Sequence, residues 1–194
     1  MRFKIFKFNS VTSTNDVAIN LIKDKKKEIG CVQANFQTRG RGTKGREWIS
    51  DIGNLFISIF FPLEKNFPPF NEFSIINSII LSNVIMHFCD KKNVNLKFPN
   101  DIFVNKKKIC GLLQEIITLN SKKYLIIGIG VNIVSNPEIN GKYQATNILF
   151  ETKKNLKVDN LTNLIISSYE KFFTNINSYN YLNYKKKAEF MSIT

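Results

Sequence analysis

The sequence has very few residues that could form covalent or metal-bound cross-links. Its 194 residues include three cysteines (Cys31, Cys89 and Cys110), with no C-x-x-C pair, and one histidine, His87. An odd number of cysteines without such spacing argues against a disulfide framework or a structural zinc site, and favours a reducing compartment. His87 lies in an apolar stretch that we expect to form a buried helix. We therefore interpret it as structural and expect no catalytic arrangement built on histidine.

The sequence also lacks a long hydrophobic run. The N-terminus alternates polar and apolar residues over positions 1–8 and has no signal-peptide core of about 7–15 apolar residues. The most apolar segment, residues 75–88, is too short for a transmembrane helix and is interrupted by Asn77, Ser78, Ser82, Asn83 and His87. We therefore expect a cytoplasmic protein with no membrane partner.

Apolar residues and lysines, in contrast, are abundant. Hydrophobic residues make up 43% of the chain and include 17 phenylalanines, which is enough for a folded core. No repeat or linker interrupts the chain, so we expect residues 1–194 to form a single domain. The formal net charge of +13 is compatible with nucleic-acid binding, and an RNA-binding module is one alternative. However, the lysine runs at 25–27, 106–108 and 185–187 fall in predicted turns or helix ends, which is typical of solvated faces.

The hydrophobic pattern predicts strands interleaved with helices. Strands are expected at residues 3–8, 30–37, 54–61, 94–98, 102–104, 109–118 and 124–133. Helices are expected after the capping residues at 12–16, from the prolines at 68–69 to about residue 89, and from about residue 158 onward. This order predicts an α+β fold, with a mainly antiparallel mixed sheet and helices packed on one face.

A Gly/Arg-rich segment, residues 37–48, connects two of the predicted strands. Three glycines alternate there with four basic residues, and an aromatic residue follows: Gly40, Gly42, Gly45, Arg39, Arg41, Lys44, Arg46 and Trp48. Glycines let backbone N–H groups approach an anion, and arginines bind phosphate or carboxylate through a planar fork. The segment is neither a Walker A loop nor a Rossmann turn. It suits a site for a nucleotide and an acid, and a mobile loop that binds RNA backbone is the alternative.

Three further segments carry polar residues at the ends of predicted elements. Asp101 follows the strand-ending Pro99 and is expected to face Lys108 across a hairpin, although a plain turn with a solvated lysine is the simpler alternative. Two glycines in the strand before Asn132 indicate close approach of a ligand or another backbone, or packing alone. Residues 13–15, Ser-Thr-Asn, are typical helix-capping residues.

The order and spacing of these segments resemble those of biotin protein ligases, from about residue 3 to residue 148. The resemblance implies a fold like that of class II aminoacyl-tRNA synthetases and biotin ligases. It implies ATP-dependent, Mg²⁺-dependent ligation of biotin, through biotinyl-5′-adenylate, to a lysine of the biotin carboxyl carrier protein of a biotin-dependent carboxylase. It implies no DNA binding, because no helix-turn-helix precedes residue 3, and a monomer or a homodimer. A lipoate-protein ligase of the same fold is the nearest alternative.

The resemblance also implies site residues. The expected catalytic residues are Lys108, Arg41, Arg46 and Asp101. Lys108 would bridge the biotin carboxylate and the α-phosphate, and Asp101 would assist the metal or the incoming amine; no metal ligands are assigned. The residues expected to bind biotin or nucleotide are Ser13, Thr14, Asn15, Gln37, Gly40, Arg41, Gly42, Thr43, Trp48, Lys97, Lys108, Gly111, Leu113, Gly128, Gly130 and Asn132.

Within this set, each group of residues has an implied task. Trp48 and Asn132 would sandwich and read the adenine. The biotin head group and tail would be hydrogen-bonded by Ser13, Thr14, Asn15 and Gln37. Biotin and its activated phosphate would be covered by Gly40, Arg41 and Gly42, while Arg46 would meet the ATP phosphates. The biotin slot would be lined by Gly111, Leu113, Gly128 and Gly130.

The sequence departs from the family pattern at three points. Thr43 stands where many bacterial members carry another arginine, which implies a looser hold on the adenylate. Phe98 replaces the usual tryptophan, a change expected to have little consequence. The small β-barrel domain that follows in many bacterial relatives is not expected before Thr194, so a ligase that binds biotin but turns over poorly is a further alternative.

Overall fold

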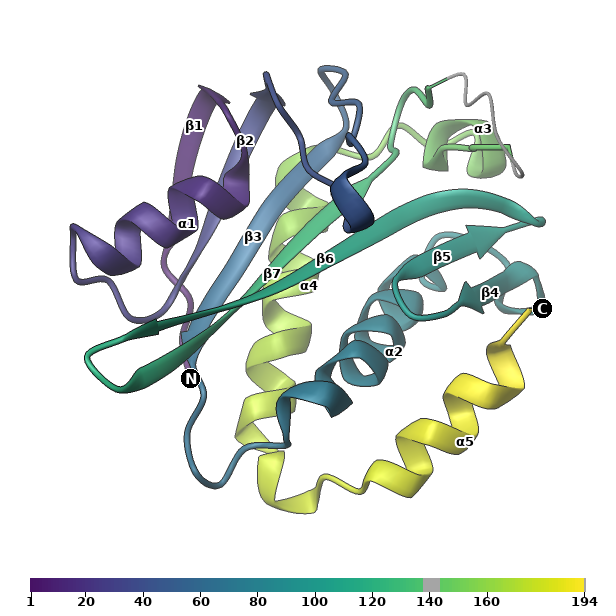
Figure 1. Cartoon of the computed structure of the whole chain (residues 1–194). Helices are drawn as coiled ribbons and strands as arrows, with labels where there is room; N and C mark the ends of the chain where they lie inside the picture. Colours follow the sequence, from purple (N-terminus) through teal and green to yellow (C-terminus); the bar gives the residue numbers. More distant parts are fainter. Residues whose placement is uncertain (138–143, 194) are drawn as a thin grey trace.

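A seven-stranded mixed sheet organises the chain (Figure 1). The computed structural model describes residues 1–137 and 144–193. The strands, in their order across the sheet, are β1 (Ile5–Val11), β2 (Gly30–Gln37), β3 (Leu55–Pro62), β7 (Lys122–Val131), β6 (Lys107–Leu119), β5 (Asp101–Val104) and β4 (Val94–Lys97). Only β1 and β2 pair in parallel, and all other neighbours are antiparallel. The predicted α+β fold with a mainly antiparallel sheet is confirmed.

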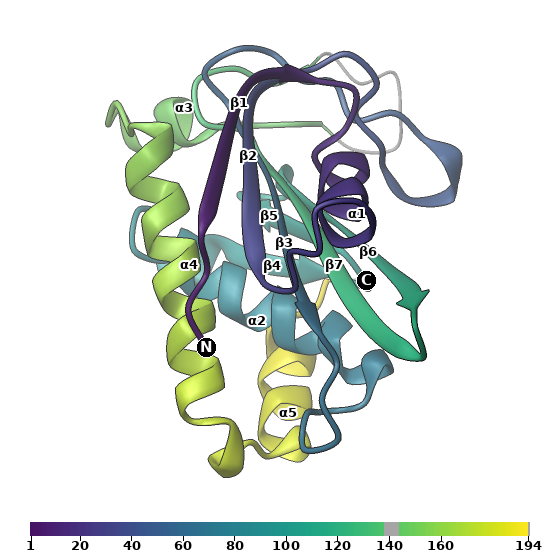
Figure 2. The same ribbon diagram turned by 90° about the vertical axis from the view of Figure 1, so that its left-hand side faces the viewer.

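Three helices cover one face of the sheet and one helix covers part of the other. α2 (Phe73–Ile85), α4 (Val158–Thr174) and α5 (Tyr181–Met191) share the larger core, while α1 (Thr14–Lys23) packs on the opposite side against β2, β3 and β7 (Figure 2). The alternation of strand side chains separates the two cores. In β3, Ile59 and Phe61 join the larger core, whereas Phe60 packs in the smaller one. α1 therefore departs from the expected packing of helices on one face.

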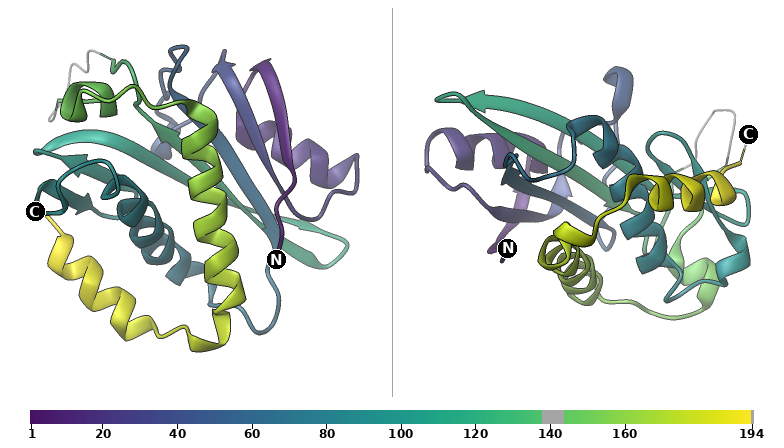
Figure 3. Two further views of the ribbon diagram at one scale, coloured as in Figure 1. Left: turned by 180° about the vertical axis from the view of Figure 1, so that it is seen from behind. Right: turned by 90° about the horizontal axis from the view of Figure 1, so that it is seen from below.

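The larger core is built around a helix with no polar face. α2 is buried on nearly every side, between the sheet and the helices α4 and α5 (Figure 3). Its buried amide, Asn77, is satisfied by two neighbours: it accepts a hydrogen bond from Tyr169 Oη at 2.9 Å and donates to Gln114 Oε1 at 3.1 Å. These bonds tie α2 to α4 and to β6, because a buried amide without partners would be costly.

Two regions of the fold differ from what the sequence predicts. The helix predicted from the prolines to residue 89 ends at Ile85, and His87 lies beyond it, exposed, with Nδ1 2.7 Å from the carbonyl of Asn83. The helix α3 (Ile148–Thr152) was not predicted, and the helix expected from about residue 158 onward is two helices, α4 and then α5, separated by residues 175–180. The second has a weak apolar pattern, because Ala188 and Met191 are buried whereas Phe190 is 92% exposed.

The structure also bears on the expected state of the cysteines and on membrane-spanning helices. Cys31, Cys89 and Cys110 are all free and buried, as the odd cysteine count predicted. Burial raises the pKa of each thiol, and that of Cys89 to about 11, which makes these groups poor nucleophiles at neutral pH. Within residues 1–137 and 144–193, no helix has the length and apolar character needed to cross a membrane.

Tight turns and a β-bulge set the register at the edge that carries the functional residues. The β5–β6 turn has positive φ at Asn105 (49°) and Lys106 (62°), as expected for a two-residue hairpin of type I′. The β5–β6 register shifts between Ile102 and Phe103: Ile102 is opposite Cys110, but Phe103 is opposite Lys108. Ile109 is the extra residue of a β-bulge, a feature that redirects side chains.

Candidate functional site

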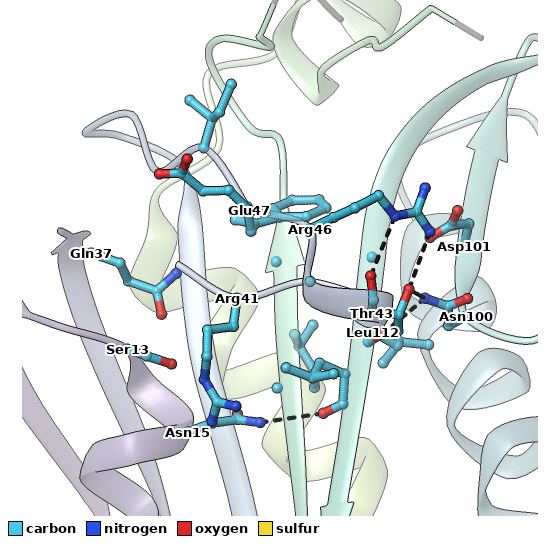
Figure 4. Close-up of a pocket in the computed structure, with 18 of the residues that line it drawn as sticks. Ser13, Asn15, Gln37, Arg41, Thr43, Arg46, Glu47, Asn100, Asp101 and Leu112 are labelled. Atoms are coloured by element: carbon cyan, nitrogen blue, oxygen red, sulfur yellow. Dashed lines mark hydrogen bonds between the residues drawn. The ribbon is translucent and has the colours of Figure 1, made fainter. Parts of the chain in front are cut away.

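An open cavity of about 420 Å³ lies beside α1, on the face of the sheet opposite α2 (Figure 4). It brings together residues from all four segments singled out in the sequence. The predicted residues that line it are Ser13, Thr14, Asn15, Gln37, Arg41, Gly42, Thr43, Arg46, Trp48, Asp101, Lys108, Gly111, Leu113, Gly128, Gly130 and Asn132. Gly40 and Lys97 are the predicted residues outside this lining.

One wall of the cavity is a buried polar network at the start of α1. Gln37 Oε1 accepts hydrogen bonds from the backbone N–H and the hydroxyl of Thr14, at 2.9 and 3.1 Å. Gln37 Nε2 donates to Ser50 Oγ at 3.0 Å, and the hydroxyl oxygens of Ser58 and Thr14 lie 2.7 Å apart. These polar groups are buried and hold one another in fixed orientations, which suits a small polar head group that needs several directed hydrogen bonds.

Asn15 extends this wall across the sheet. A Cβ at Gly128 would lie 2.5 Å from Asn15 Oδ1, so the glycine makes room for the amide. Asn15 Oδ1 accepts from Ser58 Oγ, and Asn15 Nδ2 donates to Glu115 Oε2 at 2.7 Å. Gly128, which the sequence analysis assigned to the biotin slot, therefore accommodates a protein side chain as well as lining the cavity.

The Gly/Arg-rich segment folds into a small hairpin over the cavity. Trp48 N donates to the Gly40 carbonyl at 2.8 Å, and Gly42 N donates to the Arg46 carbonyl at 2.7 Å. The turn between them contains Gly45 with φ of 72°. A Cβ at Gly40 would lie 2.3 Å from the Trp48 carbonyl oxygen, so only glycine permits this approach. Gly40 therefore shapes the hairpin without lining the cavity.

Trp48 lies on two strand glycines. A Cβ at Gly111 would be 2.5 Å from the indole ring, and one at Gly130 would be 2.4 Å from it. These glycines are opposite one another on β6 and β7, so together they form a flat seat for the ring. A close approach was predicted for the two glycines before Asn132, and at Gly130 the approaching group is this indole. The buried Nε1 of Trp48 meets no hydrogen-bond acceptor among the described residues.

Lys108 and Asp101 form an ion pair next to this ring. Lys108 Nζ lies 2.7 Å from Asp101 Oδ1, and it is 5.3 Å from the centroid of the Trp48 ring. The bulge explains the geometry: Ile109 and Cys110 both point into the larger core, so Lys108 returns to the cavity face. The predicted meeting of Asp101 and Lys108 across the hairpin is confirmed, and both side chains are largely buried.

Arg41 and Arg46, the loop arginines predicted to be catalytic, contact protein groups. Arg41 pairs with Glu115 and Asp16, and hydrogen bonding to Glu115 raises the pKa of its guanidinium. Arg46 folds back onto Thr43, with Nε 3.3 Å from the Thr43 carbonyl oxygen and NH2 3.2 Å from its hydroxyl. Figure 4 shows Arg41 directed toward Asn15, and Arg46 directed toward Thr43.

Two other predicted residues have structural partners. Asn132 Nδ2 donates to the Thr146 carbonyl at 3.0 Å, which leaves fewer of its hydrogen-bonding groups for an adenine edge. Lys97 is opposite Asp101 in the β4–β5 register, and its ammonium lies 5.9 Å from the centroid of the Phe103 ring. Its role in ligand binding stays a prediction.

Sequence reasoning missed several lining residues. They are Glu47, Ile49, Asn100, Leu112, Ile129, Pro137 and Ala145. Asn100 had a signal, because it precedes Asp101 in the turn; its Nδ2 donates to the Leu112 carbonyl at 3.1 Å and to Thr43 Oγ1 at 3.3 Å. Glu115, which contacts both Arg41 and Asn15, had none, because it lies in a strand without a recognisable motif. No group of three or more His, Cys, Asp or Glu residues in the described part of the chain could hold a metal ion.

Comparison with known proteins finds a matching family and similar chains. The model of the biotin/lipoate A/B protein ligase family matches residues 6–132. The bifunctional ligase/repressor BirA of Escherichia coli is 31% identical over 125 residues, which are 63% of this chain. The chain spans 38% of the length of that relative.

Solved structures extend the similarity to nearly the whole chain. The biotin protein ligase of Leishmania major in complex with biotinyl-5-AMP has a TM-score of 0.84 and 28% identity, covering 98% of this chain and 81% of that one. The biotin protein ligase of Aquifex aeolicus in complex with biotin and ATP has a TM-score of 0.80 and 25% identity, covering 98% and 78%.

Proposed function

Because the chain belongs to the biotin/lipoate A/B protein ligase family, we propose that it activates biotin with ATP and transfers it to a protein lysine. One observation carries the proposal: a single cavity holds the polar wall at Thr14, the Gly/Arg hairpin and the Lys108–Asp101 pair beside Trp48. The complexes of the similar Leishmania and Aquifex ligases with biotinyl-5-AMP and with biotin and ATP support the choice of biotin and ATP. We propose that residues 1–194 act as one catalytic domain.

The cavity divides into a polar end and a cationic end, which suits the two substrates. We assign the biotin head group to the wall formed by Ser13, Thr14, Asn15 and Gln37, since its buried donors and acceptors are already oriented. Trp48 offers a ring face for the adenine, and Asn132 lies on the same cavity. Leu113 and the glycines at 111, 128 and 130 form the floor between the two ends.

The chemistry needs cations more than a protein nucleophile. A carboxylate oxygen of biotin attacks the α-phosphorus of ATP, the bond to the bridging oxygen of the β-phosphate breaks, and pyrophosphate leaves. Lys108 places its ammonium between the two anions, which would otherwise repel one another. Arg41 and Arg46 supply further positive charge once they leave their protein partners. In the second step, a lysine amine of the acceptor attacks the acyl carbon and AMP leaves.

Mg²⁺ enters this scheme as part of the substrate MgATP. Mg²⁺ keeps several water ligands and is commonly held by one or two carboxylates together with phosphate oxygens. Asp101 and Glu47 are the carboxylates among the residues that line the cavity, which fits a loosely held metal better than a dedicated metal site. Asp101, 2.7 Å from Lys108, also holds that ammonium in place and is near enough to assist an incoming amine.

Thr43 suggests a looser hold on the intermediate. Its hydroxyl accepts hydrogen bonds from Arg46 and from Asn100, so it organises the turn of the hairpin without adding charge. An arginine at this position would add a cation over the activated phosphate. We therefore propose that biotinyl-5′-adenylate leaves this enzyme more readily than it leaves relatives with an arginine there.

The acceptor and the cellular compartment are also proposals. The acceptor we propose is the biotin carboxyl carrier protein of a biotin-dependent carboxylase. Three free, buried cysteines support a reducing compartment such as the cytoplasm. The RNA-binding alternative requires stacking aromatics exposed on a sheet, whereas the aromatic residues of the strands include the fully buried Phe56, Phe60, Phe61 and Phe103.

The proposal is tested by following pyrophosphate release and acceptor labelling with ATP and Mg²⁺. We expect pyrophosphate release with biotin, and biotin on the carrier-domain lysine when that domain is present. A carrier domain with its target lysine changed to arginine is the control, because it offers no amine for the second step. Pyrophosphate release with lipoate but not with biotin would refute the assignment in favour of a lipoate ligase.

A further inference from the structure

A three-residue charge cluster lies at the boundary between the hairpin and the floor of the cavity. Arg41 NH1 donates to Glu115 Oε1 at 2.8 Å, and NH2 donates to Glu115 Oε2 at 2.7 Å and to Asp16 Oδ1 at 2.8 Å. The pair with Glu115 is bidentate, the geometry in which arginine binds a carboxylate most strongly. The cluster therefore joins the hairpin to β6 and to the first turn of α1.

Glu115 also contacts the polar wall of the cavity at the start of α1. Its Oε2 accepts a hydrogen bond from Asn15 Nδ2 at 2.7 Å, while Asn15 Oδ1 accepts from Ser58 Oγ. One carboxylate thus links Arg41, on the hairpin, to the polar wall at the start of α1. The side chain of Glu115 is 26% exposed and that of Arg41 is 37% exposed, so solvent screens this pair only in part.

The charge in this cluster bears on how an anion would bind. One guanidinium faces two carboxylates, so the cluster carries a formal charge of −1. Both terminal nitrogens of Arg41 donate to these carboxylates, and hydrogen bonding to Glu115 raises the pKa of the guanidinium. A carboxylate or phosphate ligand can bind NH1 and NH2 in the same bidentate way only by displacing Glu115, because Glu115 occupies both nitrogens and Asp16 takes the second hydrogen of NH2.

We propose that Glu115 is a positioning residue that competes internally with the anionic ligand for Arg41. It holds the hairpin against β6 until the phosphate group of the activated acid takes its place on the guanidinium. The competition lowers the affinity for the anionic intermediate and leaves the affinity for the neutral head group unchanged. The chemical class of the ligand rests on the proposed function, whereas the contact that holds the hairpin does not.

The contact by which Glu115 fixes the hairpin to β6 can be tested without any ligand. Trp48, at the base of the hairpin, is the sole tryptophan of the chain, so its fluorescence reports on this segment alone. In Glu115→Gln, the amide oxygen can still accept a hydrogen bond from Asn15, but the negative charge that binds Arg41 is lost. We expect acrylamide to quench Trp48 more strongly in Glu115→Gln than in the wild type, approaching the value for Arg41→Ala. Quenching equal to that of the wild type would overturn the proposed hold.

The competition is measured by calorimetry with two probes. Biotinol-5′-adenylate replaces the acyl phosphate of the intermediate by a stable, negatively charged phosphodiester, and biotinamide carries the same head group without a charge. We expect Glu115→Gln to lower the Kd of biotinol-5′-adenylate about three- to tenfold, the range for a partly exposed ion pair that must open before binding. The Kd of biotinamide should stay within about twofold. In an Arg41→Ala background, Glu115→Gln should have no effect on either probe.

Glu47→Gln is the matched charge control. Glu47 lines the cavity but is exposed, and Figure 4 shows it directed away from Arg41. Its loss should therefore change the adenylate Kd much less than the loss of Glu115. A higher or unchanged adenylate Kd in Glu115→Gln, or an equal shift for biotinamide, would overturn the competition. Failure of the wild type to bind either probe would contradict the proposed function, and the quenching comparison would still decide whether Glu115 holds the hairpin.

Discussion

The close contact between Trp48 and Gly130 predicts the effect of Gly130→Ala. The added methyl carbon would lie 2.4 Å from the indole, where ordinary contacts begin at 3.4 Å, so the ring must move by about 1 Å. The backbone of β7 tolerates alanine, because Gly130 is not among the glycines with positive φ. The substitution therefore displaces one side chain and leaves the strand intact.

The expected consequence is a loss of nucleotide binding with little loss of stability. Stacking of a base on an aromatic ring contributes about 1–3 kcal/mol, so a displaced indole should raise the KM for ATP about tenfold. Replacing glycine in a strand stabilises by about 0.4–1 kcal/mol, which offsets the lost packing of the ring. The melting temperature should change by only a few degrees.

The assay compares KM for ATP and KM for biotin, together with the emission of Trp48. Gly111→Ala should behave like Gly130→Ala, because its methyl carbon would lie 2.5 Å from the same ring. Gly128→Ala is the control: it meets Asn15 and should raise the KM for biotin instead. Unchanged ATP affinity with unchanged Trp48 emission in Gly130→Ala would refute the assignment of Trp48 to the nucleotide.

Two further substitutions test the catalytic cation and the fold. Lys108→Ala should slow adenylate formation by about 10²–10³-fold while weakening biotin binding much less, as expected for a cation that stabilises developing charge. The measurement is the single-turnover rate of adenylate formation. Lys107→Ala, which removes an ammonium 5.6 Å from the Phe150 ring, should leave this rate unchanged. An unchanged rate in Lys108→Ala would show that the role of Lys108 is misassigned. Asn54→Ala should lower the free energy of unfolding by about 3 kcal/mol, because the Asn54 side chain accepts hydrogen bonds from the backbone N–H groups of residues 133–135. Denaturant unfolding should show no such change in Asn35→Ala, whose exposed side chain makes a single 3.5 Å hydrogen bond, and an equal loss in both variants would contradict this account.

The sequence predicted the elements whose residue pattern follows the regular period of a strand or helix. β2 begins and ends where the alternation indicated, and the hairpin turn at Asn105 was expected from its residues. The break between α4 and α5 was not predicted, because α5, with its exposed Phe190 and its lysine run, has a buried side of only two residues. The position of α1 on the opposite face could not be seen, because periodicity shows which residues of a helix are buried but not against which face.

The candidate site was predictable as a set of segments and not as a set of contacts. Residue order placed Lys108 and Asp101 in one hairpin, but the bulge at Ile109 that directs the lysine to the cavity leaves no mark in the sequence. The glycines at 128 and 130 indicated a close approach without revealing Asn15 and Trp48 as the partners. Glu115 could not be predicted, because the residues it contacts, Arg41 and Asn15, lie 74 and 100 residues away along the chain.

Direct detection of the intermediate tests the central claim most closely. The protein is incubated with biotin and α-labelled ATP in the absence of an acceptor, quenched, and its small molecules are separated by chromatography. The account predicts labelled biotinyl-5′-adenylate that depends on Lys108 and disappears, with release of AMP, when a carrier domain is added. Formation of no adenylate with biotin, or of an adenylate with lipoate alone, would contradict it.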